Sequence, residues 1–113
     1  MDAPLETGRL SRLVDELVRP LGGRADQAAR DDFTAYANKA WELVSHHIGT
    51  SDVPEAIVDE AVIACAIELQ TRRKSPSGIY SAFGEDTSPA YLARDPLSTA
   101  KAILRPYLEG GFA

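Results

Sequence analysis

The stretch PEAIVDEAVIACAIELQTRRK, from Pro54 to Lys74, decides the fold of this chain. Pro54 suits the first position of a helix, and the acidic side chains that follow it complement the positive end of the helix dipole. The basic run Arg72-Arg73-Lys74 suits the negative end, and Pro76 cannot continue the helix. The stretch therefore predicts a single long helix.

This predicted helix is apolar on nearly every side. A helix of this kind needs neighbours on more than one side, because a single packed face would leave apolar surface in water. Two explanations remain open: the helix is the centre of a compact bundle, or part of its surface faces another chain. Its apolar residues are Ala56, Ile57, Val58, Ala61, Val62, Ile63, Ala64, Cys65, Ala66, Ile67 and Leu69.

Two further helices are predicted ahead of it. Apolar residues recur at helical spacing from about Gly8 to Arg19, where Pro20 ends the pattern. A second pattern runs from Asp26 to Ile48, and Gly49 is suited to the stop. The apolar stripe of the second helix consists of Phe33, Ala37, Ala40, Trp41, Val44 and Ile48.

The segment from Ser75 to Arg94 has no helical periodicity. Irregular connections of this length are uncommon in compact domains and are usually functional loops or disordered segments. Tyr80 and Phe83 give it apolar side chains to bury, which favours a loop that becomes ordered against a partner over a passive linker.

A last helix is predicted to start with Asp95 as its N-cap and Pro96 at its first position. Its apolar side is formed by Leu97, Ala100, Ile103 and Leu104, and Pro106 should end or kink it. The fold class expected is therefore all-α: a single domain over residues 1–113, a small bundle of about four helices with a long loop before the last one. Residues 106–113 form a flexible C-terminal tail.

Composition agrees with one small globular domain. The chain has 113 residues, of which 44% are hydrophobic and 26% charged. Its net charge of -5 argues against a protein that wraps nucleic acid. The charge is unevenly placed, with a net -7 over residues 1–70 and +2 over residues 71–113. Such a division suits head-to-tail contact between copies, although chance accounts for it equally well in a short chain.

No membrane-spanning stretch or signal peptide is recognised in the sequence, so we expect a protein made and kept in the cytoplasm. No catalytic, metal or cofactor site is predicted either. His46 and His47 are adjacent and point apart on a helix, and the carboxylate pairs Asp31-Asp32 and Asp59-Glu60 fit a solvated face or a helix-dipole role. Cys65 lies among apolar residues and is interpreted as a core residue. We therefore expect no enzyme.

Four short pieces of the chain follow one another in a telling order: Val53-Pro54-Glu55-Ala56-Ile57-Val58, the alanine-rich helix ending in Arg72-Arg73-Lys74-Ser75-Pro76-Ser77-Gly78, then Arg94-Asp95-Pro96-Leu97 and Ile103-Leu104-Arg105-Pro106-Tyr107-Leu108. In their order and spacing they resemble the head-tail adaptor (connector) proteins of long-tailed bacteriophages. The resemblance extends from Val53 to Leu108, about half of the chain, and more loosely to Asp31-Asp32-Phe33.

The resemblance implies a structural virion protein, made in the host cytoplasm. Such a protein assembles as a dodecameric ring beneath the portal protein, extends the DNA channel and presents the attachment surface for the stopper and the tail. Double-stranded DNA would pass through the channel without specific binding, with which the acidic surplus is compatible. No membrane is involved.

The resemblance also implies two sets of contact residues. The C-terminal segment of relatives reaches into the portal, which here assigns portal binding to Tyr107, Leu108, Phe112 and Ala113. Contact between subunits is assigned to Arg72, Arg73, Tyr80 and Phe83. For the basic run, stabilisation of its own helix end is the alternative explanation.

Two other classes compete with the adaptor. The first is a small cytoplasmic helical regulatory module, of the antitoxin-like kind that binds one partner. The second is a helix-turn-helix DNA-binding protein, which would need a basic recognition helix. The helix from Pro54 to Lys74 is acidic at its start and apolar in its middle, which disfavours the second class.

Overall fold

The computed structural model describes residues 5–74 and 95–108, and within these ranges the chain forms four α-helices and no strand. The predicted all-α bundle is confirmed. The predicted long loop, residues 75–94, and the end of the predicted tail, residues 109–113, lie outside the described residues. The elements are α1 (Thr7–Val18), the 3-10 helix η1 (Arg19–Arg24), α2 (Gln27–Ile48), α3 (Glu55–Lys74), α6 (Ser98–Leu104) and the 3-10 helix η2 (Arg105–Tyr107).

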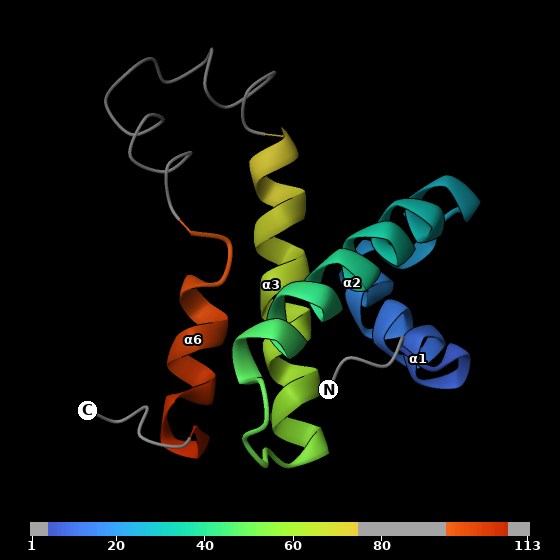
Figure 1. Cartoon of the computed structure of the whole chain (residues 1–113). Helices are drawn as coiled ribbons and strands as arrows, with labels where there is room; N and C mark the ends of the chain where they lie inside the picture. Colours follow the sequence, from blue (N-terminus) through green and yellow to red (C-terminus); the bar gives the residue numbers. More distant parts are fainter. Residues whose placement is uncertain (1–4, 75–94, 109–113) are drawn as a thin grey trace, which may run out of the picture.

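Helix α3 lies in the middle of the bundle (Figure 1). It contacts α1, α2 and α6, and α2 crosses both α1 and α3. Helices α1 and α6 lie on opposite sides of α3, and α6 runs antiparallel to it (Figure 1). None of the helices in the described ranges is both long and apolar enough to cross a bilayer.

The central position of α3 accounts for most of its apolar surface. Five of its side chains are at most 1% exposed: Val58, Ala61, Val62, Cys65 and Ala66. Ile67 differs from them because 48% of its surface is exposed. A position at the centre of the bundle therefore explains the apolar character of most of the helix. The described residues leave its surface around Ile67 uncovered.

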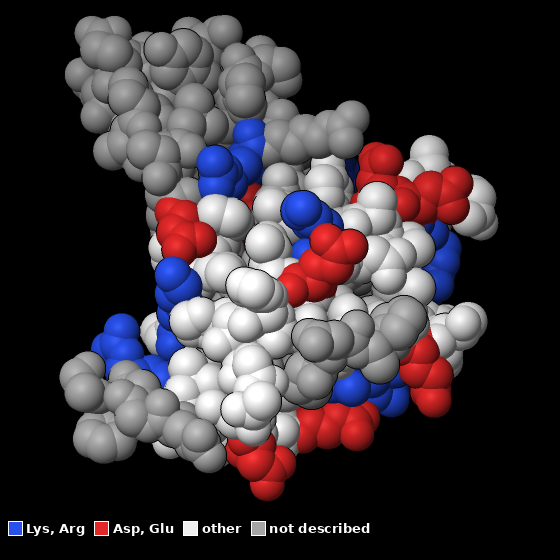
Figure 2. Space-filling view, viewed as in Figure 1, with Lys and Arg blue, Asp and Glu red and all other residues white. Residues whose placement is uncertain are grey.

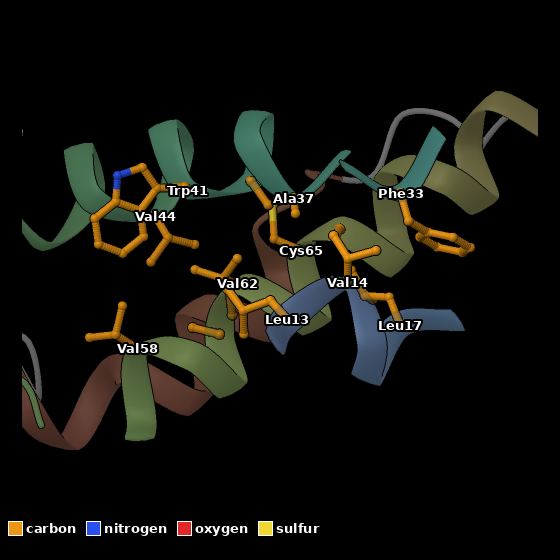
Figure 3. Close-up of a cluster of buried hydrophobic side chains, with 14 of the residues drawn as sticks. Leu13, Val14, Leu17, Phe33, Ala37, Trp41, Val44, Val58, Val62 and Cys65 are labelled. Atoms are coloured by element: carbon orange, nitrogen blue, oxygen red, sulfur yellow. The ribbon is translucent and has the colours of Figure 1, made fainter. Parts of the chain in front are cut away.

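The core is built where α2 and α3 cross. Ala37 and Ala40 on α2 are fully buried, as is Ala61 on α3, and small residues allow two helices to approach closely. Figure 3 shows Leu13 and Val14 of α1 reaching into the space between α2 and α3. All six residues of the stripe predicted for the second helix are buried, which confirms the period that defined it.

Local signals set both ends of α2 and the start of α3. The carboxylate of Asp26 caps α2 by accepting a hydrogen bond from the amide of Ala29 at 2.9 Å. Gly49 ends α2 with a φ of 60°, a conformation that residues with a side chain rarely adopt. The carbonyl of Pro54 accepts the first hydrogen bonds of α3. These boundaries lie within about one residue of the predicted ones.

The start of α6 differs from the prediction. Asp95 was expected to cap the helix directly with Pro96 as the first helical residue, but α6 begins at Ser98. The carboxylate of Asp95 accepts from the amide of Leu97 at 2.9 Å and from Lys101 Nζ at 2.8 Å, so it closes a turn that precedes the helix. These hydrogen bonds, that of Lys101 first, lower the pKa of Asp95. After α6, η2 contains Pro106, as the expected kink requires.

Helix α6 has 7 residues, too few for a stable isolated helix. Its stability comes from packing against α3, because Ala100 and Leu104 are both 0% exposed.

We therefore expect Leu104→Ala to lower the free energy of unfolding by about 2–5 kcal/mol, because it removes buried contacts and leaves a cavity. Ile67→Ala, a similar truncation at a largely exposed site, should lower it by less than about 1 kcal/mol. Urea denaturation followed by circular dichroism measures both. Equal losses for the two variants would show that α6 does not depend on this contact.

Candidate functional site

The described residues contain no cluster suited to metal binding: no three His, Cys, Asp or Glu side chains come together in these ranges. His46 is exposed and His47 half-buried. Burial lowers the pKa of His47, and the positive charge of Lys101 adds to the effect. Cys65 is completely buried, as predicted for a core residue.

The described members of the two predicted contact sets lie at opposite ends of the α3 and α6 pair. Arg72 is in the last turn of α3, whereas Tyr107 and Leu108 follow the end of α6, and the two helices run antiparallel (Figure 1). Tyr107 is 40% exposed, and Leu108 packs partly against the core. Among the described residues, Arg72 is therefore separated from Tyr107 and Leu108.

Not every predicted contact residue can be located. Tyr80, Phe83, Phe112 and Ala113 lie outside the described residues. Arg73 belongs to α3, but only its backbone is described. The half-buried Arg72 already takes part in an interaction within the chain.

A polar cluster that the sequence did not predict joins α1, α2 and α3. Arg9 Nε donates a hydrogen bond of 2.7 Å to Asp59 Oδ1, and Arg9 Nη2 lies 2.6 Å from the same oxygen. The guanidinium group is 5.0 Å from the centre of the Trp41 ring, within the range of a cation-π interaction. The side chains of Arg9 and Asp59 are only 18% and 19% exposed.

This cluster corrects the interpretation of the Asp59-Glu60 pair. Asp59 is not merely part of a solvated face, because it is the carboxylate partner of a half-buried arginine. The two residues are 50 positions apart, and no local spacing in one sequence indicates such a pair. Glu60 is exposed, as predicted.

An open groove of about 640 Å³ runs beside this cluster, between α1 and α3. Both charged and apolar side chains from the two helices line it. Its lining residues are Arg12, Leu13, Asp15, Glu16, Arg19, Ala56, Asp59, Glu60 and Ile63. We refer to it as the α1–α3 groove.

A smaller recess of about 220 Å³ lies on the other side of α3, where α6 meets the end of α2. It is lined by His47, Lys101, Arg105 and Leu108, which we call the α6 edge. The α6 edge contains two permanent positive charges and no acidic side chain, although Asp95 pairs with Lys101 at 2.8 Å.

The surface seen from the direction of Figure 1 carries no continuous basic patch. Figure 2 shows Lys and Arg residues dispersed among Asp and Glu residues, with uncharged surface between them. A duplex-binding face would need clustered positive charge, which this view does not provide.

No protein-family model, curated protein or solved structure matches the chain.

Asp59→Ala should lower the free energy of unfolding by about 1–3 kcal/mol, because it leaves the half-buried guanidinium of Arg9 without its carboxylate partner. Glu55→Ala is the matched control: Glu55 is 67% exposed and lies 3.8 Å from Arg9 Nε, so the loss should stay below about 0.5 kcal/mol. Urea denaturation of both variants tests this. If the two losses are equal, the Arg9–Asp59 pair contributes no more than a surface ion pair.

Cys65 should resist alkylation in the folded protein. Burial, with smaller contributions from the charges of Asp95 and Glu68, raises the pKa of its thiol from 9.0 to about 11. The reactive thiolate is then roughly 100-fold rarer at pH 8 than for an ordinary thiol. We expect iodoacetamide to modify the folded chain at least that much more slowly than the chain in concentrated urea. Similar rates in both states would contradict the burial of this side chain.

Proposed function

We propose that this chain is a structural virion protein, a head-tail adaptor that assembles as a ring under the portal. In this role it extends the DNA channel and provides the surface to which the stopper and the tail attach. The resemblance of residues 53–108 to such adaptors is the starting point, and an all-α bundle is the fold that the resemblance implies.

One structural observation supports this proposal most strongly: α6 holds the beginning of the C-terminal segment in a defined place. Leu104 is fully buried against the bundle and Leu108 packs partly against the core, whereas Tyr107 between them is 40% exposed. The described part of the C-terminal segment therefore ends at a fixed point on the bundle. A docking segment needs such a point if every copy in a ring is to present it in the same way.

The separation of the contact sets is also suited to a ring on a portal. Arg72 and Tyr107 lie at opposite ends of the α3 and α6 pair, so a contact between copies near Arg72 leaves the portal-binding end accessible. A single contact with a dissociation constant of about 1 mM corresponds to about 4 kcal/mol and is too weak to hold one copy at micromolar concentration. Repetition of the contact around a ring raises the overall affinity greatly.

The net negative charge of the chain is compatible with the same proposal. A net charge of -5 disfavours tight binding of the DNA backbone, and a channel wall must let DNA slide.

Truncation after Leu108 tests the proposed docking segment. The variant keeps every described residue of α6 and η2, so we expect an unchanged circular dichroism spectrum and melting temperature. Electron microscopy of the chain mixed with the portal protein of the same genome should show stacked rings for the full chain and bare portals for the truncated one. Lys39→Ala, an exposed site on α2, is the control and should dock normally.

Docking of the truncated chain would show that residues 109–113 are not needed for the portal contact. Failure of the full chain to join portals would contradict the adaptor proposal itself. A one-to-one complex with a host protein would then support the alternative, a small cytoplasmic regulatory module of the antitoxin-like kind.

A further inference from the structure

One face of α3 has no partner within the described residues. Ile67 is 48% exposed. Ile63, one helical turn before it, is half-buried and lines the α1–α3 groove. Residues four positions apart lie on the same side of a helix, so the two isoleucines form a continuous apolar strip that leads into the groove. Apolar surface that continues into a groove is surface that a protein partner can cover.

An unpaired negative charge accompanies this strip. The arginines of the groove are already neutralised: Arg12 lies 3.4 Å from Asp59, and Arg19 lies 2.7 Å from Glu16. Glu60 is exposed three residues before Ile63 and makes no ion pair with any residue of the described ranges. The groove thus combines apolar lining side chains with the carboxylate of Glu60, which forms no ion pair in the described ranges.

The α6 edge has the complementary character. Lys101 pairs with Asp95, but Arg105 is exposed and forms no ion pair within the part of the chain that is described. Leu108 lies beside it and is half-buried, so a positive charge and an apolar side chain are presented together. A partner that fits the α1–α3 groove needs both.

The two surfaces also face away from each other. Helix α1 lies on one side of α3 and α6 on the other, so one copy cannot bring its own α6 edge to its own groove (Figure 1). Complementary surfaces on opposite sides of a chain join copies head to tail, and such contacts form rings when the rotation between copies closes.

We infer that the α1–α3 groove binds the α6 edge of a second copy of this chain, with Glu60 facing Arg105 and the isoleucine strip covering Leu108. This contact deepens the proposed ring by naming its subunit interface. It differs from the contact assigned to Arg72, Arg73, Tyr80 and Phe83, and it requires no portal. It also places Leu108 in the contact between copies, so that docking to the portal is left to Tyr107, Phe112 and Ala113. The unequal distribution of charge along the sequence then has a structural role, because the acidic and basic parts meet in neighbouring copies.

Nuclear magnetic resonance of the full chain tests this contact without a portal. As the concentration rises into the millimolar range, amide signals of residues 56–67 and of residues 101–108 should shift together. Added salt should reverse the shifts, because an exposed ion pair is screened. No shift up to millimolar concentration, or shifts at only one of the two surfaces, would overturn the inference, since a symmetric contact involves a single surface.

Charge exchange identifies the pair. Glu60→Arg and Arg105→Glu should each weaken self-association by roughly threefold to tenfold, and the double variant should restore it. Both sites are exposed, and circular dichroism checks that each variant is folded. Asp32→Lys and Arg24→Glu are exposed charge reversals outside both surfaces and serve as controls. Single variants that associate normally, or a double variant that fails to recover, would overturn the pairing.

These results are separable from the portal experiment, because residues 106–113 are unchanged in every variant. Portal docking without the expected shifts would leave the adaptor proposal standing and remove this interface. The expected shifts without portal docking would do the reverse.

Discussion

The rest of this structure depends on one constraint: α3 is apolar on nearly all sides and must be covered on nearly all of them. A single packed neighbour leaves most of such a helix in water, so the chain places α2 across it and α1 and α6 on its two flanks. Alanines at the crossing let α2 approach closely, and a 7-residue α6 is long enough because it only has to complete the cover. What the three neighbours leave open, around Ile67, is the surface from which a contact between copies can be argued.

Burial alone does not explain how α1 is placed. This helix packs more extensively against α2 than against α3, and the ion pair between Arg9 and Asp59 adds a polar link to α3. Trp41 of α2 covers the same guanidinium group, so one side chain links three helices. A half-buried pair of this kind has directional geometry that apolar contacts lack. It therefore orients α1, and with α1 it defines one wall of the groove.

Local chemistry explains which parts of the fold could be predicted from the sequence. The ends of α2 and α3 follow from a capping aspartate, a glycine with positive φ and a proline, all of which act within a few residues. The start of α6 was misplaced because Asp95 can cap either a helix or a turn, and only the position of Lys101 in space decides between them. Arg9 and Asp59, like the groove and the α6 edge, depend on helices that are distant in sequence, so no spacing in one sequence indicated them.

The antiparallel packing of α6 on α3 has a consequence for the length of the chain between them. Because the end of α3 and the start of α6 lie at the same end of the pair, the bundle requires only that residues 75–94 connect two nearby points. The entropy of closing such a connection changes slowly with its length, by about 0.6 kcal/mol for each doubling. The cost of closing this connection is thus nearly independent of its length. As far as closure is concerned, the connection can lengthen or shorten while the helices on either side of it stay the same.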